Sequence, residues 1–371
     1  MNPARHTRIP PRMLIQWHIT ERCNLRCSHC YQESPPPAEP PLSLLLDILK
    51  RIEDFVIFLR NASRKPVPVH LTLTGGEPFM HPGFTTLIER IASQRDRWSF
   101  AILTNGTLLD AAAADALRPL KPAFVQISLE GAEATHDRIR GPGSFQLATR
   151  ALRLLAARRV PSYVSFTAHR DNVAEFPAVA AVARSLKATR LWADRMIPLG
   201  RGAPGSDRLL SPGETRAFFK TMQAERSRRS LSGTEIAMHR ALQFLLAGGE
   251  PYRCSAGNTL IAILPDGRLC PCRRMPLPAG NVLDRPIQEL YFESPVLRSL
   301  RDHGGPPDSC SMCFYSQLCR GGLRCLAHAV HGTPYVADPG CWLASQLAPP
   351  SAPSQAPIPP CATCLSAVQN S

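Results

Sequence analysis

Short apolar runs alternate with segments of helical periodicity from about residue 12 to residue 202. This alternation predicts a parallel sheet whose connecting helices pack outside it. Six strand–helix units fit a partial, TIM-like (β/α)6 barrel, which is an α/β fold. The predicted strands are residues 14–19, 69–73, 99–103, 124–128, 163–167 and 190–196, and the clearest predicted helices are residues 42–59, 84–94, 147–157 and 176–186.

The rest of the chain changes character twice. Residues 206–250 are predicted to be a helical connector whose helix starts at Ser211-Pro212, since Ser suits an N-cap and Pro the first turn. From residue 251 to 345 periodicity fades while Cys, Gly and Pro increase, so this small domain would need metal to hold its shape. Residues 346–371 are rich in Pro, Ser and Ala and are expected to be disordered. The barrel is therefore assigned to residues 12–205.

Composition and charge narrow the class of protein. Apolar residues make up 44% and charged residues 19% of the chain, as in globular proteins that bury a core. The net charge of +14 comes mainly from Arg residues that are scattered, which favours a compositional habit over nucleic-acid binding. No run of 18 apolar residues predicts a membrane span, and no secretory signal precedes the first strand. Thirteen cysteines in such a chain favour metal ligation in the reducing cytoplasm.

Cys23, Cys27 and Cys30 form a CxxxCxxC run just after the first predicted strand. Three thiolates on one loop can ligate three irons of a [4Fe–4S] cluster and leave the fourth iron open. Half of a zinc site is the alternative from spacing alone. The run resembles that of the radical S-adenosylmethionine (SAM) family, whose open iron chelates SAM for reductive cleavage.

Four further segments at the ends of predicted strands resemble the SAM-binding pattern of this family, as expected for a barrel whose reactive groups collect at that edge. They are Thr74-Gly75-Gly76-Glu77-Pro78, Thr104-Asn105-Gly106, Ser128-Leu129-Glu130-Gly131, where the family more often has Asp in place of Glu130, and the stretch from His136 to Gly141. The resemblance implies that SAM is bound by Gly75, Gly76 and Glu77 at its amino group, by Asn105 and Ser128, by the fork of Arg140 at its carboxylate, and by His29 at its adenine.

The second half of the chain holds a second set of cysteines that resembles the SPASM domain, which usually carries two auxiliary [4Fe–4S] clusters. The family has three residues between the third and fourth Cys of the central group, whereas this chain has five between Cys319 and Cys325. Two zinc ribbons are the alternative, because sites built from four cysteines suit both metals. The resemblance implies one cluster on Cys254, Cys272 and Cys325 with Cys270 as the extra ligand, and another on Cys310, Cys313, Cys319 and Cys341, while Cys361 and Cys364 receive no role.

Together these resemblances imply an enzyme that forms a 5′-deoxyadenosyl radical from SAM and modifies a peptide or protein, with an electron donor such as flavodoxin or ferredoxin. Enzymes acting on a small haem or quinone cofactor precursor share this architecture, and a non-catalytic iron–sulfur or zinc scaffold is the third hypothesis. Anaerobic sulfatase maturation ranks lower, because Arg273, Arg274 and Met275 follow Cys272 where that activity uses an Asp. The first strand begins within about 12 residues, so no N-terminal leader-binding domain is expected. No catalytic residue is predicted.

Overall fold

The computed structural model describes residues 9–32, 38–228, 233–302 and 305–347 of the 371-residue chain. Its centre is one ten-stranded sheet in the order β10-β9-β8-β1-β2-β3-β4-β5-β6-β7. Neighbouring strands are parallel from β8 to β7, whereas β9 and β10 are antiparallel additions. The strands are β1 (Met13–His18), β2 (Val69–Thr74), β3 (Ser99–Thr104), β4 (Phe124–Ser128), β5 (Ser162–Ala168), β6 (Arg190–Arg195), β7 (Glu235–Ala237), β8 (Leu260–Ile263), β9 (Arg268–Cys270) and β10 (Gly280–Asn281).

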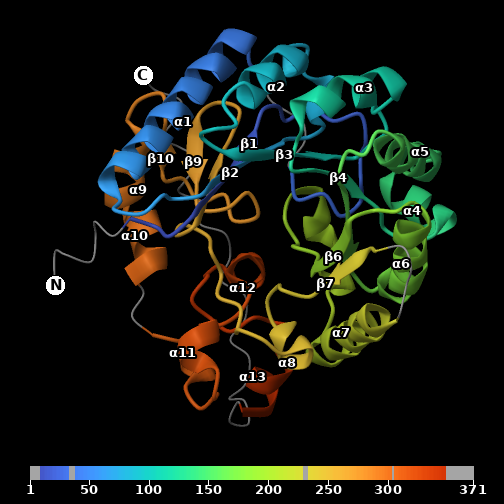
Figure 1. Ribbon diagram of the computed structural model, residues 1–371. Helices are drawn as coiled ribbons and strands as arrows, with labels where there is room; N and C mark the ends of the chain where they lie inside the picture. Colours follow the sequence, from blue (N-terminus) through green and yellow to red (C-terminus); the bar gives the residue numbers. More distant parts are fainter. Residues whose placement is uncertain (1–8, 33–37, 229–232, 303–304, 348–371) are drawn as a thin grey trace, which may run out of the picture.

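The predicted α/β barrel is confirmed, and the ends of its first six strands lie within one residue of the prediction. Figure 1 shows the sheet curving into an open barrel with helices α1 to α6 around its outer side. The helices are α1 (Leu42–Ala62), α2 (Phe84–Ala92), α3 (Ala111–Leu120), α4 (Glu133–Arg140), α5 (Ser144–Ala157), α6 (Phe176–Ser185), α7 (Pro212–Ser227), α8 (Phe244–Ala247), α9 (Ile287–Glu293), α10 (Pro295–Asp302), α11 (Ser316–Cys319), α12 (Arg324–His331) and α13 (Trp342–Leu347).

The spacing of apolar residues explains how the helices cover the sheet. In α1 the buried side chains, among them Leu45, Ile48 and Ile52, recur every three or four residues and form one stripe. That stripe belongs to the same hydrophobic core as buried strand residues such as Trp17 and Phe100. The barrel wall is thus packed from outside, which leaves its inner face available for polar side chains.

The connector helix α7 begins at the predicted position. Ser211 Oγ accepts a hydrogen bond from Glu214 N at 3.3 Å, and Glu214 Oε2 accepts one from Ser211 N at 2.8 Å. This reciprocal capping box fixes the first turn, in which Pro212 supplies a preset backbone angle. The chain then adds β7, which pairs with β6 and so extends the barrel sheet.

The Cys-rich stretch also contributes to the sheet, which the fading periodicity did not predict. Strand β8 pairs in parallel with β1, and all of its residues are buried. One sheet therefore contains strands from all three of the predicted units, and the boundaries at residues 205 and 250 stay a prediction. The first two residues of the predicted disordered tail, 346 and 347, end helix α13, and the rest of the tail lies outside the described residues, together with Cys361 and Cys364. Within the described ranges no helix is both long and apolar enough to cross a bilayer.

A buried ion pair joins the end of β6 to the segment before Cys341. Arg195 Nη1 and Nη2 each donate to one carboxylate oxygen of Asp338 at 2.6 Å, and both side chains are almost fully buried. The Asp338 oxygens also accept hydrogen bonds from the backbone amides of Leu323 and Gly340. The Asp338 carboxylate thus accepts hydrogen bonds from the Arg195 guanidinium and from two backbone amides, and its negative charge strengthens all of them.

Replacing Asp338 by Asn is expected to destabilise the protein by about 3–5 kcal/mol, because the guanidinium of Arg195 would stay buried without a counter-charge. The measurement is the free energy of unfolding in urea at matched iron content.

The control is Asp115→Asn, which breaks an equally bidentate pair with Arg158 on the surface and should change stability little, since solvent screens exposed charges. Equal effects of the two substitutions would contradict the role given to the buried pair.

Candidate active site

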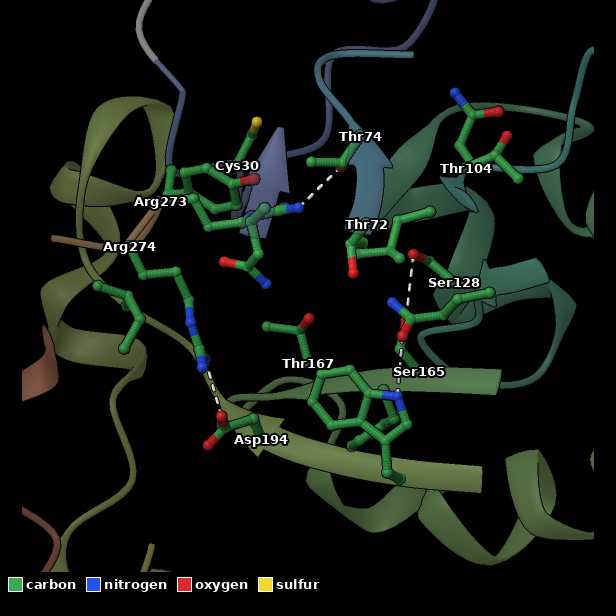
Figure 2. A pocket seen from close by; sticks show the side chains of 18 of the residues that line it. Cys30, Thr72, Thr74, Thr104, Ser128, Ser165, Thr167, Asp194, Arg273 and Arg274 are labelled. Carbon is green, nitrogen blue, oxygen red and sulfur yellow. Dashed lines mark hydrogen bonds and ion pairs between the residues drawn. The ribbon is translucent and has the colours of Figure 1, made fainter. Parts of the chain in front are cut away.

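A cavity of about 500 Å³ occupies the inside of the barrel and reaches the C-terminal ends of its strands. Its walls are side chains from alternate strand positions, such as Thr72, Gln126 and Ser165, because every second residue of a strand points to the same face. At the strand ends it is lined by Cys23, Cys27 and Cys30. Figure 2 shows Ser128 and Ser165 on one side of this cavity and Arg273 and Arg274 on the other.

The loop that carries the three cysteines is held by the glycine turn after β2. Gly76 N donates to Thr20 O at 2.9 Å, and Glu77 N donates to Arg22 O at 2.8 Å. A Cβ at Gly75 or Gly76 would collide with these same carbonyl groups, so only glycine permits the approach. The two glycines therefore fix the start of the cysteine loop, and their contact with SAM stays a prediction.

The carboxylate of Glu77 is fully buried and already bonded within the chain. It accepts hydrogen bonds from Thr104 Oγ1 at 2.7 Å, Asn105 N at 2.8 Å and Phe79 N at 3.2 Å. Burial raises the pKa of Glu77 to about 7, against the opposing effect of these hydrogen bonds. The Asn105 amide in turn donates to Asn24 Oδ1 at 2.9 Å and lies 3.8 Å from Cys23 Sγ. Glu77 and Asn105 thus tie the end of β3 to the cysteine loop.

Glu130, Arg140 and His29 form a second buried network beside the cysteines. Glu130 Oε1 accepts from Arg140 Nη2 at 2.5 Å and lies 3.4 Å from His29 Nε2. Burial alone would raise the pKa of Glu130, but Arg140 and His29 hold it well below its usual value. The remaining Arg140 nitrogen, Nη1, lies 3.7 Å from Cys27 Sγ. The Arg140 fork expected to bind the SAM carboxylate is therefore shared between Glu130 and a thiol, and its contact with SAM stays a prediction.

The donor set around the first three cysteines fits an iron–sulfur cluster bound with SAM. The thiols are soft ligands that influence one another, and burial raises the pKa of Cys23 to about 11, so metal binding would release protons. Among the described residues His29 Nδ1 is buried without a hydrogen-bond partner, and Ser128 Oγ faces the cavity 3.3 Å from Ser165 Oγ. These polar groups would hold SAM, for which the cavity has room.

The auxiliary cysteines fall into two groups in the folded chain. Burial raises the pKa of Cys325, and the nearby thiols of Cys272 and Cys254 raise it further. A small second cavity is lined by the other group, Cys310, Cys313, Cys319 and Cys341.

Cys319 belongs to the second of these groups and Cys325 to the first. The chain between them turns from α11 into α12 through Arg320, Gly321 and Gly322, which all have left-handed backbone angles. Within the described residues no three His, Cys, Asp or Glu side chains have the spacing of ligands to a single ion. Thiolates around a cubane cluster instead bind different irons.

Cys270 lies near Cys272, and its role as the extra ligand stays a prediction. Its side chain is 2% exposed and packs with Ala262 and Leu264 in a small apolar cluster at β8 and β9. Burial raises the pKa of its thiol to about 12, and the Cys272 thiol helps to raise it.

The structure adds two cavity residues that the sequence did not suggest, Arg273 and Arg274. Their position directly after Cys272 could have marked them as site residues, but the sequence does not reveal that they reach the barrel cavity. Burial lowers the pKa of Arg273 to about 10, which leaves the side chain charged at neutral pH.

Two sequence families match the chain. Residues 17–182 match the radical SAM superfamily, and residues 254–314 match the iron–sulfur cluster-binding SPASM domain. The matches coincide with the two cysteine-bearing halves described above and agree with the resemblance inferred from the motifs.

Several curated proteins are similar over most of their length. Mycofactocin maturase MftC of Mycobacterium ulcerans is 30% identical over 84% of this chain and 82% of that protein. AdoMet-dependent heme synthase of Methanosarcina barkeri is 28% identical over 88% and 95%, and PqqA peptide cyclase of Gluconobacter oxydans is 28% identical over 90% and 91%. The structure of anSMEcpe with bound AdoMet has a TM-score of 0.71 over 91% of this chain and 92% of that chain at 20% identity, which shows a common fold.

We expect Cys270→Ala to lower the iron content of the anaerobically reconstituted protein less than Cys272→Ala does, because the Cys270 thiol packs among apolar side chains. The matched change Cys272→Ala should lower the iron content, since Cys272 lies beside Cys254 and Cys325. Iron and sulfide analysis measures both variants. Equal iron loss in the two variants would identify Cys270 as a ligand on a par with Cys272.

Glu130→Gln should destabilise the protein at pH 7, where the ionised carboxylate pairs with Arg140 and His29. Since folding lowers the pKa of Glu130 below its usual 4.5, this advantage of the wild type is complete above pH 4.5 and shrinks as the pH falls further. Urea unfolding at several pH values measures the difference. Exposed Glu133→Gln is the control, and a difference independent of pH would contradict the assignment.

Proposed function

Because the chain belongs to the radical SAM superfamily, we propose that this enzyme cleaves SAM in its barrel and modifies a peptide. The observation that carries the proposal is the convergence of Cys23, Cys27 and Cys30 with the strand-end motifs around one cavity. Cys23, Cys27 and Cys30 would hold a [4Fe–4S] cluster, which would supply the electron for reductive cleavage of SAM to a 5′-deoxyadenosyl radical able to abstract hydrogen from the substrate.

The chain's own residues bind, orient and shield the reactants. We propose that Ser128, His29 and the glycine turn at Gly75-Gly76 hold SAM at the strand ends. The polar inner wall, including Thr72 and Gln126, would receive the substrate. A cavity of about 500 Å³ lies in the range of small-molecule sites, so with SAM bound it would admit one side chain of a peptide rather than a folded domain.

The two groups of auxiliary cysteines would hold further [4Fe–4S] clusters that exchange electrons with the substrate site. Cys272 is joined to the cavity by Arg273 and Arg274, which follow it directly. We propose a reduced flavodoxin or ferredoxin of the cytoplasm as the electron donor.

The peptide substrate is supported by the similarity to PqqA peptide cyclase, a protein named for a peptide substrate. A small cofactor precursor is the second candidate, supported by the 28% identity to a heme synthase over 95% of its length. Both candidates use the same cavity and the same cleavage of SAM.

The expected result after anaerobic reconstitution and reduction with dithionite is formation of 5′-deoxyadenosine from SAM. The Cys23/Cys27/Cys30→Ala variant should form none, because it lacks the ligands of the proposed SAM-binding cluster. Chromatography of the quenched reaction measures the nucleoside. Zinc in place of iron and no nucleoside from the wild type would leave only the scaffold hypothesis.

Substrate class is tested with peptides encoded beside the gene and with tetrapyrrole precursors. A mass change in a peptide, dependent on SAM and absent with the triple variant, is the expected result. A change only in the tetrapyrrole would favour the second candidate.

A further inference from the structure

Two arginines from the second half of the chain enter the barrel cavity. Arg273 Nη1 donates to Thr74 Oγ1 at 2.8 Å, and its guanidinium lies 4.6 Å from the ring centre of Tyr31. Arg274 Nη1 forms an ion pair with Asp194 Oδ2 at 2.8 Å. Figure 2 shows Arg273 close to Cys30, with a dashed line for its hydrogen bond to Thr74.

The cavity wall carries a large excess of positive charge. Among the described lining residues there are seven arginines and one carboxylate, that of Asp194. Four of the arginines have a carboxylate partner within 4 Å. These pairs are Arg140 with Glu130, Arg190 with Glu235, Arg195 with Asp338 and Arg274 with Asp194.

Two of the other three arginines have compensating neighbours. Arg240 lies over the Trp192 ring at 4.4 Å and is close enough to Asp194 to help lower the pKa of that carboxyl. Arg201 lies near Cys27, whose thiolate would face it. Arg273 also lies near a thiol, that of Cys30, so charge alone does not single it out. What distinguishes it is the hydrogen bond to Thr74, which orients its guanidinium at the strand end without a carboxylate partner within 4 Å among the described residues.

Among the described residues Arg273 has no carboxylate within 4 Å, and its neighbours are the Thr74 hydroxyl, the Tyr31 ring and the Cys30 thiol, which the proposed cluster would engage. The nearby acid Glu21 accepts a hydrogen bond from Gln32 and remains outside ion-pair distance. A partly buried guanidinium without an anion is costly, so such a residue in a cavity wall indicates a ligand that supplies the anion. The planar guanidinium of Arg273 can donate two parallel hydrogen bonds to a carboxylate, whereas the Thr74 hydroxyl accepts a hydrogen bond from Nη1 alone.

We propose that Arg273 binds a carboxylate of the substrate at the cluster end of the cavity. The proposal rests on the proposed function and narrows the substrate to a molecule with a carboxylate near the carbon to be modified. In a peptide this is an acidic side chain or the C-terminus. The ion pair of Arg274 with Asp194 holds the neighbouring residue, so the Arg273 fork is presented from an anchored loop.

The rival source of a carboxylate is the methionine moiety of SAM. Arg140 lies across the cysteine loop at Cys27, whereas Arg273 comes from the auxiliary half and bonds to Thr74. The test therefore measures the affinities for SAM and for a separate carboxylate independently.

The probe is N-acetylglutamate N′-methylamide, compared with its uncharged glutamine analogue, titrated calorimetrically into the reconstituted holoenzyme saturated with SAM. The wild type should bind the acid roughly ten- to hundredfold more tightly than the amide, as expected for a charge-assisted hydrogen bond. Arg273→Gln should lose this preference, and Arg273→Lys should keep part of it. The control Arg190→Gln removes the same charge from the same cavity and should retain the preference.

Equal binding of acid and amide to the wild type would overturn the proposal without any variant. The proposal would also be overturned if Arg273→Gln, at unchanged iron content, still bound the acid more tightly than the amide. A tenfold or greater loss of SAM affinity in this variant, with the acid excluded by SAM in the wild type, would assign Arg273 to the cofactor instead. Because the assay needs no turnover, failure of SAM cleavage would count against the proposed function alone.

Discussion

Two ion pairs at the end of β6, one buried and one partly buried, hold the halves of the chain together. Consecutive strand residues point to opposite faces, so Asp194 meets Arg274 after Cys272 while Arg195 meets Asp338 before Cys341. Both auxiliary groups of cysteines are thereby tied to one strand of the barrel. Because buried charges lose their hydration, each pair tolerates little displacement, and the placement of the cysteines relative to the cavity follows from this constraint.

The opposite side of the cavity is fixed by hydrogen bonds rather than by charge. The glycine turn after β2 binds the chain just before Cys23, and Glu77 links that turn to the end of β3. Arg140 then connects Cys27 to Glu130. The cysteine loop is therefore supported by several strand ends, which explains how a loop without regular structure can present three thiols in a defined arrangement.

The sequence predicted most of the barrel because its strands are short segments rich in apolar residues that alternate with amphipathic helices. It missed β7 and β8, which have three and four residues and depend on pairing with distant β6 and β1. The convergence of the SAM motifs was predictable, since parallel strands end at one edge. The hydrogen-bond partners of Glu77 and Arg140 were not predictable, because a motif does not reveal which side-chain atoms are already bonded within the chain. Arg273 reaches Thr74 across 199 residues, a contact that only tertiary packing creates.

The central claim is that Cys23, Cys27 and Cys30 hold a cluster to which SAM binds directly. Electron paramagnetic resonance of the dithionite-reduced protein, recorded with and without SAM, tests it most directly. The account predicts that SAM changes the signal of one cluster, and that this responsive signal is missing from the Cys23/Cys27/Cys30→Ala variant while the auxiliary signals remain. A reduced wild type whose spectrum is indifferent to SAM, or a responsive signal that persists in the variant, would contradict it.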